Sequence, residues 1–137
     1  MCAMGIDTSR VQMLLAVLHR HSGVSAFDQN VYVKIVGGVR LNEPAADLPV
    51  LLAAHSSLCG RPLPAGLAVF GEVGLAGELR AVQDAETRLR EAAKLGFTHA
   101  LLPSQCRLKK SVPGIEVISA ARVDSALAAM REMRQAA

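Results

Sequence analysis

The chain has 137 residues, of which 51% are hydrophobic and 20% charged, a length and composition typical of one globular domain. This balance excludes an intrinsically disordered chain, and no apolar run approaches the ~20 residues that cross a bilayer. The formal net charge of +3 permits contact with a polyanion without requiring it.

The N-terminal half of the chain predicts two helices with a strand between them. Apolar residues at helical spacing predict an amphipathic helix over 8–21, and alternation over 30–37 predicts a strand that ends at a pair of glycines. Pro44 suits a first helical position, and the apolar run after it predicts a buried helix over 45–58. Pro49 removes one backbone donor from this helix, so we expect its early turns to be disturbed.

The C-terminal half predicts four strands and two helices. The strands are expected over 67–73, 77–82, 98–102 and 115–119, with the first two joined as a hairpin. Asp84 is the expected N-cap of a helix that Gly96 ends, and a last amphipathic helix begins near Val123. Helices and strands therefore mix along the whole chain.

Motifs for nucleotide, metal and nucleophilic chemistry are weak in this sequence. It contains neither a GxxxxGK[ST] motif nor a GxGxxG that follows a strand, so it predicts no ATP site. The three cysteines, Cys2, Cys59 and Cys106, are odd in number and widely spaced, which favours free thiols over disulfides or a zinc site. His55 and Cys59 lie four residues apart on one helix face, but packing or solvation is the simpler interpretation of this pair.

Three segments carry a resemblance to a known family: DQNVYVKIVGGVRLNEPAADL (28–48), VFGEVGLAGELRAV (69–82) and RLREAAKLGFTHALLP (88–103). Together they resemble the C-terminal domain of the RadA (Sms) family of bacterial DNA repair proteins, which is itself similar to the proteolytic domain of Lon proteases. The resemblance runs from about Gly5 to the C-terminus. It implies the α+β fold class, with a ribosomal S5 domain 2-like mixed sheet packed with helices, as a single domain over 1–137. It also implies that the chain is the C-terminal fragment of a longer protein.

The resemblance also implies that peptidase chemistry is lost. Active Lon-type proteases carry a serine in a Pro-Ser-Ala-Gly segment and a lysine at the start of the helix after the hairpin. Here Ala45 falls at the serine, Asp47 at the glycine and Glu86 at the lysine, so both a nucleophile and the amine that would activate it are missing. An alternative is a residual peptidase that uses another nucleophile, for which the candidates are Ser56, Ser57 and Cys59.

Assembly and DNA binding remain as the roles that the resemblance implies. RadA-type proteins act as hexameric rings on branched recombination intermediates, with recombinase and other repair proteins as further partners. ATP, magnesium and zinc are expected only in the N-terminal parts of the longer protein, and no cofactor is expected in this chain. The first residues lack the pattern of a secretory signal, so we expect a cytoplasmic protein.

Contact with DNA phosphates requires positive charge that is gathered on one surface. The candidates in this chain are Lys34, Arg40, Arg80, Arg107, Lys109 and Lys110. The last three share one loop, and because no aromatic residues are interleaved with them, binding of a duplex backbone is favoured over stacking on single strands. A third interpretation is a pure oligomerisation module that makes no direct contact with DNA.

Overall fold

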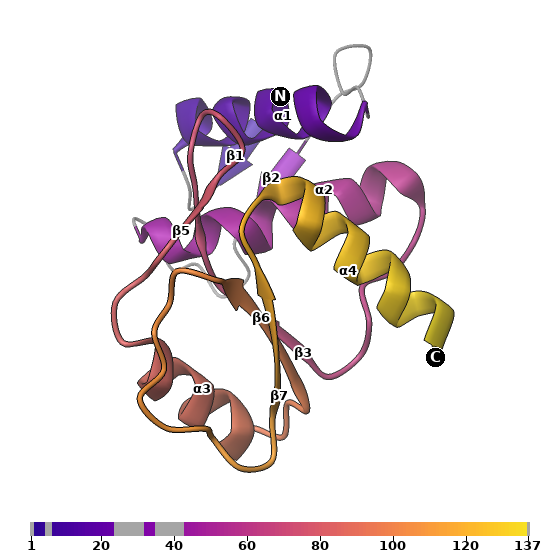
Figure 1. Ribbon diagram of the computed structural model, residues 1–137. Coiled ribbons are helices and arrows are strands. Elements are labelled where there is room, and N and C mark those ends of the chain that lie inside the picture. The colour runs from indigo at the N-terminus through magenta and orange to yellow at the C-terminus, as the bar shows by residue number, and fades with distance from the viewer. Residues whose placement is uncertain (1, 5–6, 24–31, 35–42, 137) are drawn as a thin grey trace.

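The computed structural model describes residues 2–4, 7–23, 32–34 and 43–136 (Figure 1). Within these ranges the chain has a mixed α+β structure, with a parallel three-stranded sheet, a parallel pair of strands, an antiparallel hairpin and four α-helices. The helices are α1 (Thr8–Ser22), α2 (Asp47–Cys59), which follows the short 3-10 helix η1 (Pro44–Ala46), α3 (Ala85–Lys94) and α4 (Val123–Ala136). The strands are β1 (Cys2–Met4), β2 (Tyr32–Lys34), β3 (Leu67–Val69), β4 (Glu72–Val73), β5 (Leu79–Arg80), β6 (His99–Pro103) and β7 (Glu116–Ala120).

The three-stranded sheet has the order β3-β6-β7, and all three strands run parallel. His99 at the start of β6 pairs with Leu67 of β3 on one side and with Glu116 of β7 on the other. Neighbouring parallel strands need a long connection because the chain must return to the same end of the sheet. Between β6 and β7 that connection is the loop 104–115, which carries the basic residues that the sequence singles out.

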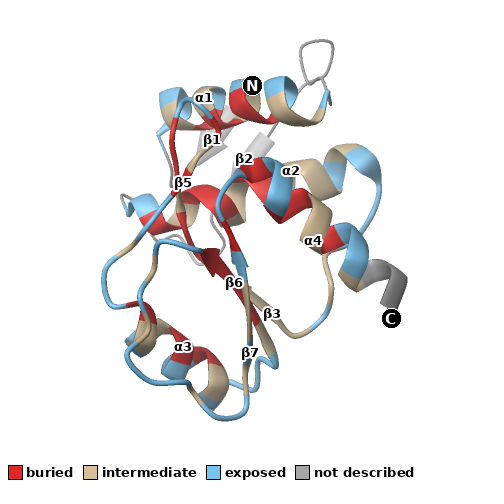
Figure 2. Cartoon of the chain, in the orientation of Figure 1, coloured by how far each residue is buried: buried red, intermediate tan, exposed pale blue. Residues whose placement is uncertain are grey.

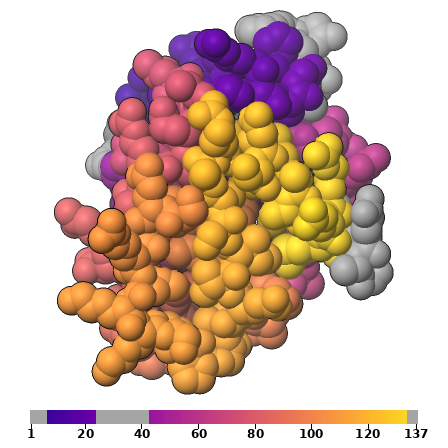
Figure 3. Space-filling model, in the orientation of Figure 1, coloured from indigo at the N-terminus to yellow at the C-terminus, as the bar shows by residue number. Residues whose placement is uncertain are grey.

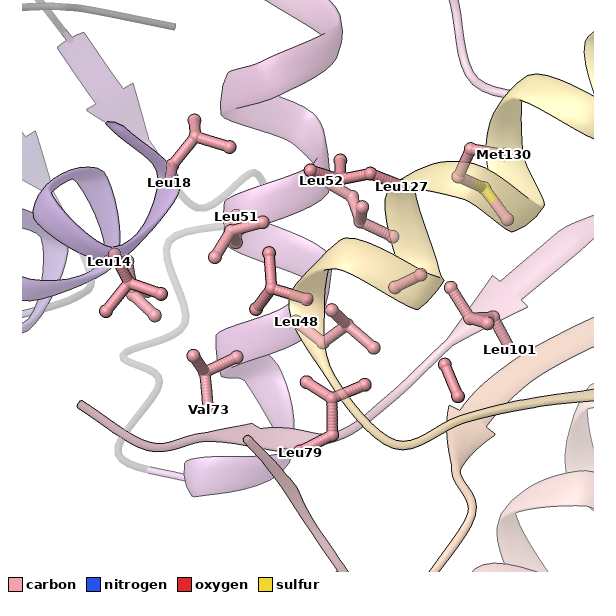
Figure 4. Close-up of a cluster of buried hydrophobic side chains, with 14 residues drawn as sticks. Leu14, Leu18, Leu48, Leu51, Leu52, Val73, Leu79, Leu101, Leu127 and Met130 are labelled. Carbon is pink, nitrogen blue, oxygen red and sulfur yellow. The ribbon is translucent and has the colours of Figure 1, made fainter. Parts of the chain in front are cut away.

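The central strand β6 is buried from Ala100 to Pro103 (Figure 2). It divides the apolar side chains into two clusters, one on each face of the sheet. Leu101 belongs to the first cluster, whereas Ala100 and Leu102 belong to the second, as the alternation of side chains along a strand requires. Helices α1, α2 and α4 supply most of the first cluster, and Figure 4 shows their leucines converging on Val73, Leu79 and Leu101.

The second cluster lies beneath α3, on the other side of the sheet from α2 and α4 (Figure 1). It consists of Ala45, Phe70, Ala85, Leu89, Ala100 and Leu102. Full burial of a leucine such as Leu89 stabilises the fold by about 2 kcal/mol. This cluster therefore fixes the start of α3 against η1 and β6. The loop 104–115 packs against the same cluster.

The helices predicted in the N-terminal half are confirmed, with one refinement. The side chain of Asp7 caps α1 by accepting a hydrogen bond from the N–H of Ser9 at 3.1 Å. The helix predicted over 45–58 opens as η1 and continues as α2, so its first turn is 3-10. Pro49 then lies in the first turn of α2, where a backbone N–H has no partner within the helix in any case. Of the strand predicted over 30–37, β2 is described and its flanks lie outside the described residues.

Asp84 occupies the N-cap position of α3 as predicted, but its expected capping role is wrong. Its backbone lies in the left-handed region with φ at +60°, and its side chain makes no capping hydrogen bond to α3. Aspartate tolerates this conformation better than most residues. Gly96 lies just beyond the end of α3 with φ at +94°, which confirms its prediction as the terminating glycine.

The strand predicted over 67–73 is interrupted, and its two parts serve different sheets. β3 pairs with β6, whereas β4 pairs with β5 in the predicted antiparallel hairpin. Between them the N–H of Gly71 donates to the carbonyl of Ala45 at 2.9 Å and the carbonyl of Gly71 accepts from Leu48 at 3.0 Å. These bonds tie the interruption to η1 and α2, so the chain leaves one sheet and enters the other at that point. No helix within the described ranges has the length and apolar character needed to cross a membrane.

Candidate nucleic-acid interface

The loop 104–115 presents three exposed basic side chains, those of Arg107, Lys109 and Lys110. Apolar residues of the same loop alternate with them, and Leu108 and Val112 are half-buried against the second cluster. The apolar side chains therefore attach the loop to the fold while the cationic ones face solvent. In Figure 3 the orange surface that contains this loop borders the pink surface of segments that precede it in the chain.

A carboxylate from α3 holds the backbone of this loop. Oε1 of Glu86 accepts hydrogen bonds from the N–H groups of Lys109 and of Lys110, the second at 3.3 Å. The other oxygen of Glu86 lies 3.7 Å from the guanidinium of Arg90, one turn further along α3. Hydrogen bonds to an ionised acceptor are stronger than those between neutral groups. The side chain of Glu86 is 25% exposed, whereas Lys109 and Lys110 are exposed residues.

A pocket of about 390 Å³ separates the start of α3 from the loop. Three basic side chains line it, those of Arg90, Arg107 and Lys109, together with the acidic Asp84 and Glu86. Because both oxygens of Glu86 already face donors, the pocket offers its remaining donors to an anionic ligand. Sequence reasoning missed Arg90, although its spacing of four residues from Glu86 is the usual one for an ion pair on a helix.

Of the remaining predicted DNA-binding residues that the structure describes with their side chains, Arg80 and Lys110 do not line this pocket. Arg80 is exposed on β5, with its guanidinium 3.8 Å from the carboxylate of Glu78. Lys34 lies in β2, but its side chain is not among the described parts of the structure, and Arg40 lies outside the described residues. The structure thus brings Arg107 and Lys109 together at one pocket, with Lys110 next to Lys109 on the same loop, and leaves Arg80 out of the pocket lining.

Ala45, at the predicted serine position, is buried in η1 and packs in the second cluster together with Ala85. Ala85 directly precedes Glu86, so the two positions predicted to be degenerate lie on elements that meet in one apolar cluster. A methyl group provides no nucleophile, and a carboxylate that accepts two N–H bonds has no proton-accepting role like that of a neutral amine. The contacts made by Ala45 and Glu86 are those of packing and loop attachment.

Asp47 is a buried charged residue that sequence reasoning noted only as a departure from the expected glycine. Its side chain is 1% exposed at the start of α2, where Oδ1 pairs with Nε of Arg10 from α1. Its second oxygen accepts the N–H of Val73 from β4 at 3.1 Å. The hydrogen bond from Arg10 to Asp47 raises the pKa of the Arg10 guanidinium, and this outweighs the lowering effect of its partial burial. One carboxylate therefore joins α1, α2 and the hairpin.

Comparison with known proteins identifies the chain's relatives. The DNA repair protein RadA of Pseudomonas aeruginosa is 48% identical over 129 residues, which make up 94% of this chain. RadA of Escherichia coli K12 is 47% identical over 131 residues and RadA of Bacillus subtilis 44% over 126, or 96% and 91% of the chain. No protein-family model matches the chain.

The chain is homologous to a segment of bacterial RadA. It spans 28% of the length of each of these three RadA relatives. The resemblance noted in the sequence is thereby confirmed at the level of this RadA segment.

The remaining nucleophile candidates of this RadA homologue lie in and just after α2. Sγ of Cys59 is exposed and lies 3.5 Å from Nε2 of His55, as their shared helix face predicts. Ser56 donates from Oγ to the carbonyl of Arg61, which is the local satisfaction expected of a serine near a helix end. Ser57 is exposed. Among the residues that the structure describes, no three His, Cys, Asp or Glu side chains gather to hold a metal ion.

Proposed function

We propose that the chain is a non-proteolytic, Lon-protease-like module of a RadA-type DNA repair protein, and that its loop 104–115 binds the DNA backbone. The observation that carries this proposal is the exposed cluster of Arg107, Lys109 and Lys110, attached to α3 through Glu86 and extended by Arg90. Cations fixed on one surface neutralise phosphates and release counterions, which supplies affinity that does not depend on base sequence. The homology to RadA supports a role in DNA repair.

The wider context is part of the same proposal. The chain forms one ribosomal S5 domain 2-like domain over 1–137, and in the longer protein it helps to assemble a hexameric ring around DNA. The ATP, magnesium and zinc sites belong to other parts of that protein, and the partners are DNA and other repair proteins in the bacterial cytoplasm. The buried methyl group of Ala45 and the engaged carboxylate of Glu86 support a module without peptidase activity.

Fluorescence anisotropy with a labelled duplex, repeated over a salt series, tests the binding role. Log affinity should fall linearly with log salt concentration, and replacing Lys109 by alanine should reduce that slope by about one. The matched control is Lys94→Ala, because Lys94 is an exposed lysine of α3 that pairs with Glu91 and does not line the pocket. Equal slopes for the two variants would show that Lys109 does not neutralise a phosphate, and absence of duplex binding by the unsubstituted chain would favour a pure oligomerisation module that makes no direct contact with DNA.

A residual peptidase is the second candidate, and the contact between Cys59 and His55 is the observation that favours it. Incubation with unfolded casein, compared between the chain and its Cys59→Ala variant, decides this question. Sustained cleavage that the substitution abolishes would establish the peptidase, and absence of cleavage in both samples is the result that we expect.

A further inference from the structure

The backbone N–H groups of the loop 104–115 find two kinds of acceptor: backbone carbonyls near its start and a side-chain carboxylate in its basic stretch. Near its start the N–H of Ser104 donates to the carbonyl of Ala120 at 2.8 Å, and that of Cys106 donates to Pro103 at 3.0 Å. In the basic stretch, the backbone of Lys109 and Lys110 is held by the carboxylate of Glu86. A side chain from α3 thus accepts backbone hydrogen bonds that, in a sheet, the carbonyl groups of a neighbouring strand would accept.

The cationic side chains depend on this attachment for their placement. Arg107 and Lys109 reach the same pocket from the loop, while Arg90 reaches it from α3. Holding flexible cations in one arrangement before the ligand arrives lowers the entropy lost on binding. Glu86 holds both parts, because it accepts from the loop backbone with one oxygen and faces Arg90 with the other.

We propose that Glu86 is the positioning residue of this interface: its carboxylate fixes the loop so that Arg90, Arg107 and Lys109 form one pocket for a phosphate group of the DNA backbone. This inference rests on the proposed DNA-binding function and adds to it a defined subsite and the residue that shapes it. The chemistry fits because guanidinium and ammonium groups donate strong, charge-assisted hydrogen bonds to phosphate oxygens.

The direction in which Glu86→Ala changes the affinity for DNA distinguishes a positioning role of Glu86 from a simple electrostatic effect of its charge. Glu86 carries a negative charge next to a surface that binds a polyanion, so charge alone predicts tighter DNA binding when Glu86 is replaced by alanine. Positioning predicts the opposite result, because the alanine variant loses the acceptor for Lys109 and Lys110. The matched control is Glu91→Ala, which removes the same charge from an exposed site on α3 that pairs only with Lys94 among its described ion pairs.

Two readouts are taken on the full chain carrying Glu86→Ala, Glu86→Gln or Glu91→Ala. Amide hydrogen exchange followed by NMR reports on the backbone of Lys109 and Lys110 without any DNA. We expect exchange roughly tenfold faster in Glu86→Ala, and little change in Glu86→Gln, whose amide oxygen still accepts both N–H groups. For a labelled DNA duplex at low salt we expect Glu86→Ala to bind roughly three- to tenfold more weakly than Glu91→Ala.

Each outcome decides a separate part of the inference. Unchanged exchange at Lys109 and Lys110 in Glu86→Ala overturns the positioning role. Faster exchange with duplex affinity equal to or above that of Glu91→Ala overturns the phosphate pocket. If the unsubstituted chain binds no duplex, the proposed function fails, while the exchange data still decide the attachment of the loop. Glu86→Met, which keeps the length of the side chain, is measured in parallel in case the alanine variant fails to fold.

Discussion

The ion pair between Arg10 and Asp47 gives the sharpest prediction about the stability of this fold. Replacing Arg10 by methionine keeps an apolar stem of similar length but removes the guanidinium. Asp47 then keeps one hydrogen bond, from the N–H of Val73, and becomes a buried charge without its counterion. We therefore expect Arg10→Met to unfold far more easily than the unsubstituted chain.

The size of the effect follows from the burial of the two partners. Removing one partner of a buried pair costs about 3–5 kcal/mol, because the remaining charge is left uncompensated. Here the side chain of Asp47 is 1% exposed but that of Arg10 is 29% exposed, so water partly screens the pair. A loss of about 2–3 kcal/mol in the free energy of unfolding is the resulting estimate, which corresponds to roughly 10 °C in melting temperature for a chain of this length.

Urea denaturation of Arg10→Met and of a matched control measures this loss. The control is Arg20→Met, which removes an exposed arginine from the same helix α1. Adding Asp47→Asn to Arg10→Met should restore part of the stability, because asparagine keeps an acceptor for the N–H of Val73 and removes the buried charge. Equal midpoints for Arg10→Met and Arg20→Met would refute the assignment of a stabilising role to this pair.

The pH dependence of the pair follows from the raised pKa of Arg10. Since the pKa is higher in the folded state than in the unfolded state, the contribution of Arg10 is complete below its unfolded value and is lost only as the pH rises through the raised one. We therefore expect the stability difference between Arg10→Met and the unsubstituted chain to stay constant between about pH 6 and pH 9. A difference that shrinks across this interval would contradict a stabilising role of the charged Arg10 guanidinium.

Three further substitutions test the packing and the absence of peptidase chemistry. Gly77→Ala should lower the free energy of unfolding, measured by urea denaturation, by about 1–2 kcal/mol, because Gly77 has φ at +82° and a Cβ there would lie 2.5 Å from the ring of His21. Leu101→Ala, on the central strand, should cost about 3 kcal/mol in the same assay, and a cost near zero would contradict its place in the first cluster. Ala45→Ser should destabilise the fold by about 1–2 kcal/mol, because it buries a hydroxyl group. We also expect this variant not to cleave unfolded casein, and sustained cleavage would count against the proposed function.

Local signals in the sequence predict much of the secondary structure. The caps and spacing of α1, the glycines of the hairpin and Gly96 after α3 act within a few residues of the elements that they define, so the pattern alone locates them. Local signals do not predict that the strand over 67–73 is interrupted. Its interruption at Gly71 depends on backbone bonds to Ala45 and Leu48, which no pattern within the strand contains.

The candidate site depends mostly on contacts that are distant in sequence. Glu86 lies 23 residues from Lys109, and Arg10 lies 37 residues from Asp47. Neither distance corresponds to a helix or strand period, so the pairing emerges only when the elements pack together. One signal was available for the second pair: Asp47 is the single charge in the otherwise apolar run 44–54, and a buried charge requires a partner. The sequence does not identify that partner.

Peptidase chemistry and the shape of the basic loop would make opposite demands on position 86. A lysine there, as in the pattern of the active proteases, offers no oxygen to accept the N–H groups of Lys109 and Lys110. It would also add a positive charge beside Arg90, Arg107 and Lys109 at the pocket. A glutamate accepts the backbone N–H groups of the loop and compensates part of that positive charge, but it cannot serve as the neutral amine that activates a serine. In our proposal, therefore, the residue that excludes proteolysis at this position is also the residue that forms the phosphate pocket.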